Sequence, residues 1–192
     1  SAADEPDLQR PVLSASGHVF RGQIREAAGD ISGARADYLQ AVTLDSRCAA
    51  AYQARGELRR RLGEFLGALS DHTKAAELTG APELRLAQAV LLIELRRHGE
   101  ARLLLDAALA REPNSVPARL ARARVLVAQR ELALARQDVE AAQAIAPDSN
   151  SVLVQVALLK SAEGDREGAV EIYERLLSKR PKELTVLNNL GT

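Results

Sequence analysis

The side chains best suited to metal binding or nucleophilic chemistry in this chain are three histidines and one cysteine: His18, His72, His98 and Cys48. The histidines are far apart in the sequence, so the spacing His-x-x-x-His, which places two ligands on one turn of a helix, does not occur. Cys48 is followed by three alanines, and no neighbour in the sequence could activate its thiol. These residues predict no metal site, no cofactor and no catalytic residue.

Charged groups also lack the patterns that carry phosphate or acid–base chemistry. The acidic pairs Asp4-Glu5 and Glu163/Asp165 fall where capping and solvation explain them, and no glycine-rich phosphate loop is present. The basic run Arg59–Arg61 could suggest nucleic acid, but few aromatic residues surround it. With 26 basic and 26 acidic side chains the net charge is zero, which argues against a nucleic-acid or membrane-surface partner. No apolar stretch is long enough for direct membrane insertion.

The elements that carry these residues are set by a repeat. One position is alanine five times, with successive gaps of 34, 33, 34 and 34 residues: Ala34, Ala68, Ala101, Ala135 and Ala169. Such a period is typical of helical solenoids, whose repeats bury their apolar faces by stacking on one another. On this scaffold, His18 and His72 fall where other repeats carry packing residues, and His98 falls at a turn between helices.

Each repeat contains two segments with apolar residues at helical spacing. In the fifth, Gly164 ends the first segment, because glycine adopts the left-handed cap conformation without steric cost. Asp165 can cap the next helix, and Pro181 marks its end. The sequence therefore predicts ten helices in five antiparallel pairs, and a short eleventh that begins near Leu184.

The repeat resembles the tetratricopeptide repeat, a helix–turn–helix unit. The family's small and aromatic positions are occupied in the first two repeats by Gly22, Gly29, Ala34, Tyr38 and Ala41, and by Tyr52, Gly56, Gly63, Ala68 and Ala75. The resemblance implies an all-α fold, a right-handed α-solenoid of stacked repeats. We expect a linker at 1–14, repeats 1 to 5 at 15–48, 49–81, 82–115, 116–149 and 150–183, and the start of a sixth at 184–192.

One charge pattern is specific to this chain. The seventh residue of a repeat and the twenty-third, 16 residues later, are Arg and Asp together in repeats 1, 2 and 4, and neither is present in repeats 3 and 5. We expect three structural ion pairs between the two helices of a repeat, since a guanidinium matches a carboxylate in shape. They are Arg21 with Asp37, Arg55 with Asp71, and Arg122 with Asp138.

The resemblance implies a concave surface lined chiefly by the first helix of each repeat. In repeats 1 and 2 these positions are mostly polar, among them Gln23, Glu26, Glu57, Arg60 and Arg61. In repeats 3 to 5 they form a mostly apolar set, which we call the apolar strip: Leu86, Val90, Ile93, Leu120, Arg124, Val127, Val154 and Leu158. An exposed strip of this kind would bind an apolar or amphipathic peptide or helix. The alternative is that these side chains pack between helices of their own solenoid.

These features together predict a non-enzymatic scaffold that binds a protein or peptide in its concave groove. Repeat proteins of this type serve in bacterial envelope assembly or polysaccharide secretion, which is an argument from analogy. The alternative is a non-catalytic arm of a larger enzyme such as a glycosyltransferase. The chain has no methionine and stops early in a sixth repeat, so we expect a fragment of a larger bacterial repeat protein, in the periplasm or the cytoplasm.

Overall fold

The computed structural model describes residues 13–179, which form ten α-helices and no strand. This confirms the prediction of an all-α helical-repeat fold. The eleventh helix expected near Leu184, the expected sixth repeat and most of the expected linker at 1–14 lie outside the described residues. The helices are α1 (Ala15–Ala27), α2 (Ile31–Leu44), α3 (Ala49–Arg61), α4 (Phe65–Thr79), α5 (Pro82–Glu94), α6 (His98–Arg111), α7 (Val116–Ala128), α8 (Leu132–Ile145), α9 (Asn150–Glu163) and α10 (Arg166–Lys179).

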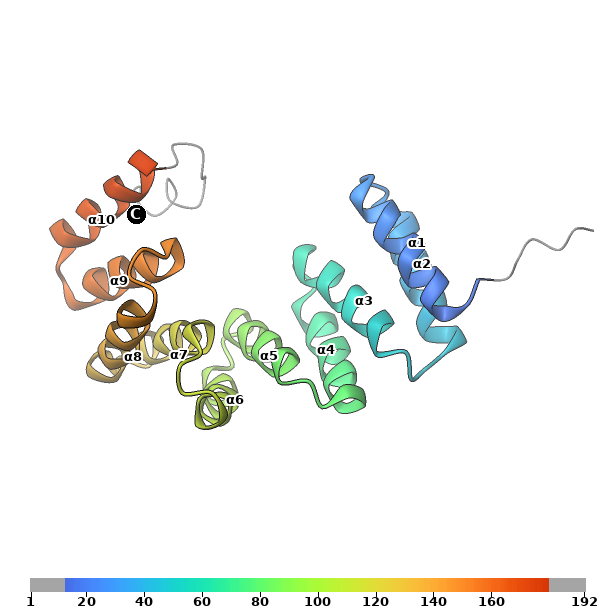
Figure 1. Cartoon of the computed structure of the whole chain (residues 1–192), viewed down its shortest axis with the longest axis horizontal. Helices are drawn as coiled ribbons and strands as arrows, with labels where there is room; N and C mark the ends of the chain where they lie inside the picture. The colour runs from blue at the N-terminus through green and yellow to red at the C-terminus, as the bar shows by residue number, and fades with distance from the viewer. Residues whose placement is uncertain (1–12, 180–192) are drawn as a thin grey trace, which may run out of the picture. The chain divides into compact units, whose positions relative to one another are not determined.

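Consecutive helices pair within the expected repeats. The odd-numbered helices begin at residues 15, 49, 82, 116 and 150, which are the first residues of the five expected repeats. Helix α1 packs on α2, α3 on α4, α7 on α8 and α9 on α10, as the hairpins of Figure 1 show. The chain divides into two compact units, an N-terminal unit (Ser1–Leu84) and a C-terminal unit (Arg85–Thr192), and α5 begins at the end of the first.

The turn between the two helices of a repeat has the same backbone conformation in every repeat. Its fifteenth residue has a positive φ five times, at Gly29, Gly63, Arg96, Arg130 and Gly164. Glycine adopts this left-handed conformation freely, whereas a side chain at the same angle is strained by roughly 1–2 kcal/mol. The sequence therefore signals the turn clearly in repeats 1, 2 and 5, while arginine hides it in repeats 3 and 4.

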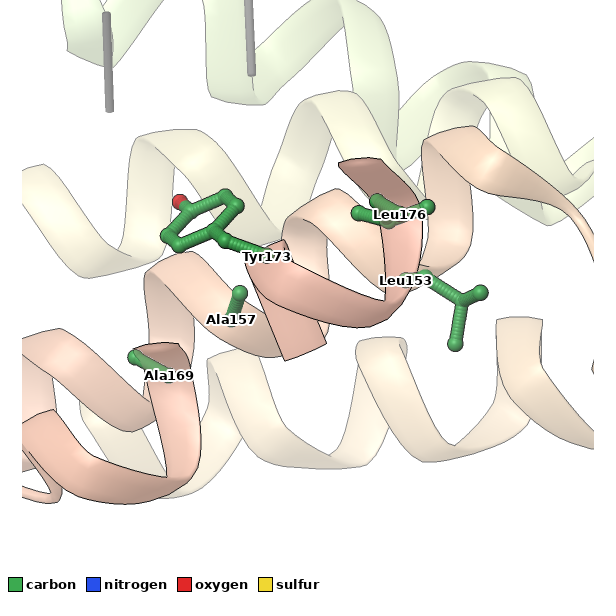
Figure 2. Close-up of a cluster of buried hydrophobic side chains, with 5 residues drawn as sticks. All are labelled: Leu153, Ala157, Ala169, Tyr173 and Leu176. Carbon is green, nitrogen blue, oxygen red and sulfur yellow. The ribbon is translucent and has the colours of Figure 1, made fainter. Parts of the chain in front are cut away.

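Small residues let the paired helices approach closely. In the C-terminal unit, Leu153 and Ala157 of α9 pack against residues of α10 in one buried cluster, drawn in Figure 2 with Ala169, Tyr173 and Leu176. In the first repeat the corresponding approach is closer still, because a Cβ added to Gly22 would lie 2.5 Å from the ring of Tyr38. The buried rings thus depend on a glycine or an alanine at the eighth position of the first helix.

Candidate partner-binding surface

In repeats 1, 2 and 4, a buried ion pair joins the first helix to the second. Arg55 donates to Asp71 through Nε at 2.9 Å and Nη2 at 2.7 Å, and Arg122 donates to Asp138 at 2.7 and 2.8 Å. The Nε of Arg21 lies 3.0 Å from the Oδ2 of Asp37. Each aspartate is only 2% exposed, so each negative charge is held inside the repeat.

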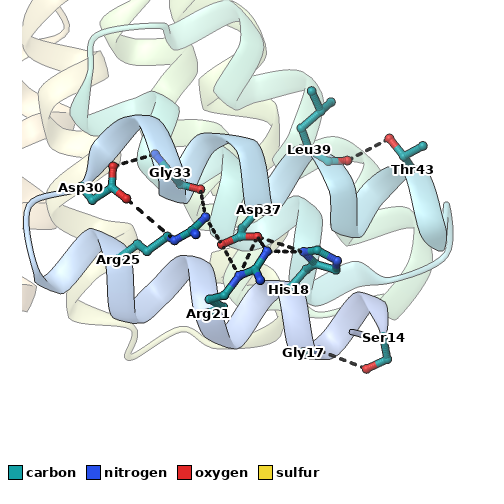
Figure 3. A network of polar contacts seen from close by, with 10 residues as sticks. All are labelled: Ser14, Gly17, His18, Arg21, Arg25, Asp30, Gly33, Asp37, Leu39 and Thr43. Atoms are coloured by element: carbon teal, nitrogen blue, oxygen red, sulfur yellow. Dashed lines mark hydrogen bonds and ion pairs between the residues drawn. The ribbon is translucent and has the colours of Figure 1, made fainter. Parts of the chain in front are cut away.

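Each buried aspartate has more side-chain partners than the sequence pattern predicts. Asp37 is contacted by His18 at 2.9 Å and by Arg25 at 2.9 Å in addition to Arg21 (Figure 3). Asp71 also accepts from Arg59 at 2.8 Å. These added donors stand three residues before or four residues after the seventh position, on the same face of the first helix.

The fourth repeat shows the same arrangement with one addition. Arg119 donates to Asp138 at 3.1 Å, three residues before Arg122. Arg122 itself also donates to Asp106 of α6 at 2.7 Å, so one guanidinium joins two repeats. The i−3 and i+4 spacing of basic residues around the seventh position was the available sequence signal for these contacts.

The network in the first repeat keeps the carboxylate of Asp37 ionised. The hydrogen bonds from Arg21, aided by His18 and by the charge of Arg25, lower the pKa of Asp37 to about 2 although its burial opposes the shift. A carboxylate held this strongly in its charged form is a poor general base near neutral pH. The charge of Asp37 is thus used to hold α1 against α2.

A second set of ion pairs joins consecutive repeats. The twenty-first residue is arginine in repeats 1, 3 and 4, and each reaches a glutamate near the turn of the next repeat. Arg35 lies 2.6 Å from Glu64, Arg102 lies 2.6 Å from Glu131, and Arg136 lies 2.8 Å from Glu163. These pairs are largely exposed, so each contributes at most about 1 kcal/mol, but they mark which edge of a repeat faces its neighbour.

The apolar strip predicted in repeats 3 to 5 is only partly accessible. Ile93 and Leu120 are 7% and 9% exposed, and Leu120 packs with Ala142 and Val152 in the core. For these two positions the predicted exposure was wrong, because their side chains turn into the helix packing. The remaining apolar members are half-buried: Leu86, Val90, Val127, Val154 and Leu158.

The one charged side chain of the apolar strip already has an ion-pair partner. Arg124 is exposed on α7 and its Nη2 lies 3.1 Å from the Oε1 of Glu94 on α5. Val127 packs against the buried cluster of Ala123 and its neighbours, and Val154 packs against that of Leu153. The accessible part of the apolar strip is thus formed by its half-buried side chains and one paired arginine. We call this part the half-buried ridge.

A distinct pocket of about 350 Å³ lies on the first helices of the N-terminal unit. It is lined by residues of α1 and α3 and by one residue of α2, namely Gln23, Glu26, Ala27, Tyr38, Ala54, Glu57 and Arg61. Four of these, Gln23, Glu26, Glu57 and Arg61, are among the polar concave residues expected from the sequence. The lining thus combines the apolar side chains of two alanines with polar and charged groups.

The polar lining of this pocket is ordered by hydrogen bonds. The hydroxyl of Tyr38 donates to Glu26 at 2.7 Å, and burial raises the pKa of Tyr38, which keeps this hydroxyl protonated. Glu26 also pairs with Arg61 across the pocket. Glu57 accepts two hydrogen bonds from Arg60, at 2.7 and 2.9 Å, and these bonds lower the pKa of Glu57. These bonds fix the pattern of charges that lines the pocket.

The sequence of the C-terminal unit matches a known repeat family: residues 86–150 match the tetratricopeptide repeat. Several solved repeat proteins share the fold over most of the chain. YrrB, a protein with an unusual peptide-binding site, has a TM-score of 0.66 at 19% identity, with 93% of each chain covered. Residues 86–150 are therefore assigned to the tetratricopeptide repeat, and the chain shares the fold of solved tetratricopeptide-repeat proteins.

Other solved structures have a similar fold. A repeat protein of Parabacteroides merdae has a TM-score of 0.73 at 19% identity, with 90% of this chain and 69% of that chain covered. MamA of Desulfovibrio magneticus has a TM-score of 0.73 at 14% identity, with 88% and 97% covered. No curated protein matches the chain in sequence. Tetratricopeptide-repeat proteins are generally non-catalytic scaffolds for protein partners.

The other candidate residues of the chain contact or pack against structural side chains. His18 contacts Asp37, and Cys48 is half-buried against the cluster of Val19, Ala41 and Ala51. His72 is 5% exposed, and neither of its ring nitrogens has a hydrogen-bond partner among the described residues. Within residues 13–179, no three His, Cys, Asp or Glu side chains gather closely enough to hold a metal ion. None of the helices in that range combines the length and the hydropathy that a membrane span requires.

Proposed function

We propose that this chain is a non-enzymatic scaffold that holds a segment of a partner protein, a peptide or a helix, against the first helices of its repeats. The observation that carries the proposal is the pocket between α1 and α3, which combines alanines with an ordered set of charged side chains. Pockets of 300–1,000 Å³ with few, well-placed polar groups are typical binding sites. The peptide-binding site of the structurally similar YrrB supports the same use of the fold.

The half-buried ridge of the C-terminal unit is the second part of the proposed surface. Leu86, Val90, Val127, Val154 and Leu158 retain accessible apolar area, and Arg124 stands beside Val127. An amphipathic partner segment would cover this area and exchange the pair of Arg124 with Glu94 for a contact of its own. By analogy with other repeat proteins, we propose bacterial envelope assembly or polysaccharide secretion as the setting.

The test is site-directed photo-crosslinking in cells of the source organism. A photoreactive residue replaces Gln23, which lines the pocket, and in the matched control it replaces Gln40, an exposed glutamine of α2 outside the pocket. We expect Gln23 to give a discrete adduct with a partner protein and Gln40 to give none. Ala27→Trp, which fills the pocket, should abolish that adduct.

Two results would contradict the pocket as the binding site. One is an adduct of equal yield from both positions, and the other is an adduct from Gln23 that survives Ala27→Trp. For the ridge, Leu158→Glu should weaken capture of the same partner, whereas Glu174→Gln on the exposed side of α10 should leave it unchanged.

A further inference from the structure

Helix α1 has a second exposed face, which is not covered by its partner helix α2. Phe20 and Ile24 are four residues apart on α1 and are therefore neighbours on one face. They are 65% and 54% exposed. Two large apolar side chains displayed together in this way are unusual in a helix whose other apolar residue, Val19, is buried.

In the other repeats the tenth position is buried, whereas the sixth position is buried in repeats 4 and 5 and half-buried in repeats 2 and 3, at Ala54 and Ala87. At the tenth position, equivalent to Ile24, Leu58 is 2% exposed, Val125 is 0% and Leu159 is 4%. At the sixth position, equivalent to Phe20, Ala121 is 6% and Gln155 is 4% exposed. Exposure of this face is thus a property of repeat 1 and not of first helices in general.

In repeats 2, 4 and 5, the second helix of the preceding repeat packs on the first helix. Helix α2 packs on α3, α6 on α7 and α8 on α9. Leu58 packs in one cluster with Ala34 and Tyr38 of α2, and Leu159 packs with Ala135 and Val139 of α8. The covering helix therefore offers an alanine and, four residues later, a larger apolar side chain.

Ion pairs between consecutive repeats lie at the same edge of the first helix. Arg35 and Arg102 follow the first alanine of the covering helix and reach Glu64 and Glu131, each the sixteenth residue of the next repeat. The sixteenth residue of repeat 1 is Asp30, whose carboxylate is 53% exposed. It accepts from the backbone N–H of Gly33 at 2.8 Å and lies 3.8 Å from Arg25, which leaves it open to a further cation from outside.

We infer that the face of Phe20, Ile24 and Asp30 binds an amphipathic helix of a partner protein that has the chemistry of a second repeat helix. This surface goes beyond the groove proposed above. The partner helix presents alanine, then arginine toward Asp30, an apolar residue four positions after the alanine, and a second small residue near Phe20. The small residue is required because Phe20 is larger than Ala54, which stands at its place in α3.

The probe is a stapled, fluorescein-labelled peptide of α2 (Ile31–Leu44), which carries this pattern as Ala34, Arg35, Tyr38 and Ala41. Fluorescence anisotropy with the full chain should show saturable binding. Phe20→Ser and Ile24→Ser should each weaken binding about tenfold, because both side chains are buried by the helix. The matched control is Leu66→Ser on α4, since Leu66 is 68% exposed and lies outside the face.

The charge contact is tested separately. Asp30→Asn keeps a residue that caps the helix N-terminus but removes the charge, and it should weaken binding of the peptide roughly threefold. The peptide with Arg35→Glu should bind weakly to the original chain. With the Asp30→Asn variant, the affinities of the original peptide and the Arg35→Glu peptide should differ less. Equal binding of both peptides to both chains would overturn the proposed orientation.

A photoreactive phenylalanine analogue in place of Phe20 identifies the occupant. An adduct with the labelled peptide supports the inference. An adduct between two copies of the chain, or one within the chain to residues 1–12, would assign the face to another occupant and overturn it. Binding that is unchanged by Phe20→Ser and Ile24→Ser, with both variants folded by circular dichroism, would overturn it as well.

Discussion

Arg55 and Asp71 form a bidentate ion pair between the two helices of the second repeat, with contacts of 2.9 and 2.7 Å. The guanidinium also lies over the ring of Tyr52, 5.5 Å from its centre, and Arg59 supplies a second cation to the same carboxylate. The pair is therefore held from several sides. It joins helices that are consecutive in the chain, so it sets their angle and spacing within the repeat.

Removing one residue of this pair should lower the free energy of unfolding by more than an exposed ion pair contributes to it. Arg55→Leu leaves the buried Asp71 with Arg59 alone, and we expect the free energy of unfolding to fall by about 2–3 kcal/mol. In a double-mutant cycle with Asp71→Leu, measured by urea denaturation, the coupling energy should be about 2 kcal/mol.

The matched control is the largely exposed pair of Arg35 and Glu64. Its coupling energy should be below about 1 kcal/mol, because water and salt screen exposed charges. Additive losses at Arg55 and Asp71, or equal coupling in both cycles, would contradict a structural role for the buried pair.

Replacing a strained arginine by glycine should stabilise the fourth repeat. Arg130 has φ 64° at the position where other repeats carry Gly29, Gly63 and Gly164. Arg130→Gly removes the steric cost of the left-handed conformation, and we expect the unfolding free energy to rise by about 0.5–1 kcal/mol. Thermal and urea denaturation measure this change.

The reciprocal substitution provides the control. Gly63→Arg places a side chain at φ 75° and should destabilise the protein by about 1 kcal/mol. If Arg130→Gly destabilises the protein, contacts of the arginine side chain outweigh the backbone strain.

His72 should make stability depend on pH. Burial lowers the pKa of His72 and Arg60 lowers it further, although Glu57 and Asp71 oppose the shift. A folded-state pKa below the unfolded value of about 6.5 means that the unfolded chain binds the proton more readily. Stability is therefore fully present above about pH 6.5 and declines as the pH falls below that value.

The variant His72→Phe should remove this decline. The ring position is compatible with an aromatic residue, since Tyr38 and Tyr173 occupy it in repeats 1 and 5. We expect the variant to be more stable than the original chain at pH 5 by about 1 kcal/mol, with a smaller difference at pH 8. Parallel stability curves for the two proteins between pH 8 and pH 5 would rule out His72 as the cause.

The close approach of α1 and α2 should make Gly22 intolerant of substitution. The Cβ of Gly22→Ala would lie 2.5 and 2.8 Å from two ring carbons of Tyr38, and overpacking of this kind costs about 1–3 kcal/mol. We expect a clear drop in the melting temperature. Adding Tyr38→Leu, the residue type found at this position in repeat 3, should recover part of the loss.

Gly99→Ala is the control for helix propensity, because the added Cβ would point into open space. It should leave the melting temperature unchanged or raise it slightly. A melting temperature for Gly22→Ala equal to that of Gly99→Ala would mean that the helices can separate at no cost.

Sequence periodicity alone was enough to predict the helices, because each repeat must bury an apolar face against its neighbours and so reproduces the same pattern. The joint presence of Arg and Asp 16 residues apart also pointed to contacts such as that of Arg55 with Asp71. It did not predict that Arg59 joins the same carboxylate. A long side chain can reach several partners, and only the packing of the helices selects among them.

Surface and core positions could not be separated by the same means. Leu120 and Leu158 are both apolar residues of first helices, yet Leu120 is buried with Ala142 and Val152 while Leu158 remains half-buried. The sequence by itself determined the repeat, its helices and the placement of its charges, since these depend on local spacing. Only the tertiary structure decided which side chains remain accessible, because neighbouring positions on a helix differ by a rotation that the packing of adjacent repeats sets.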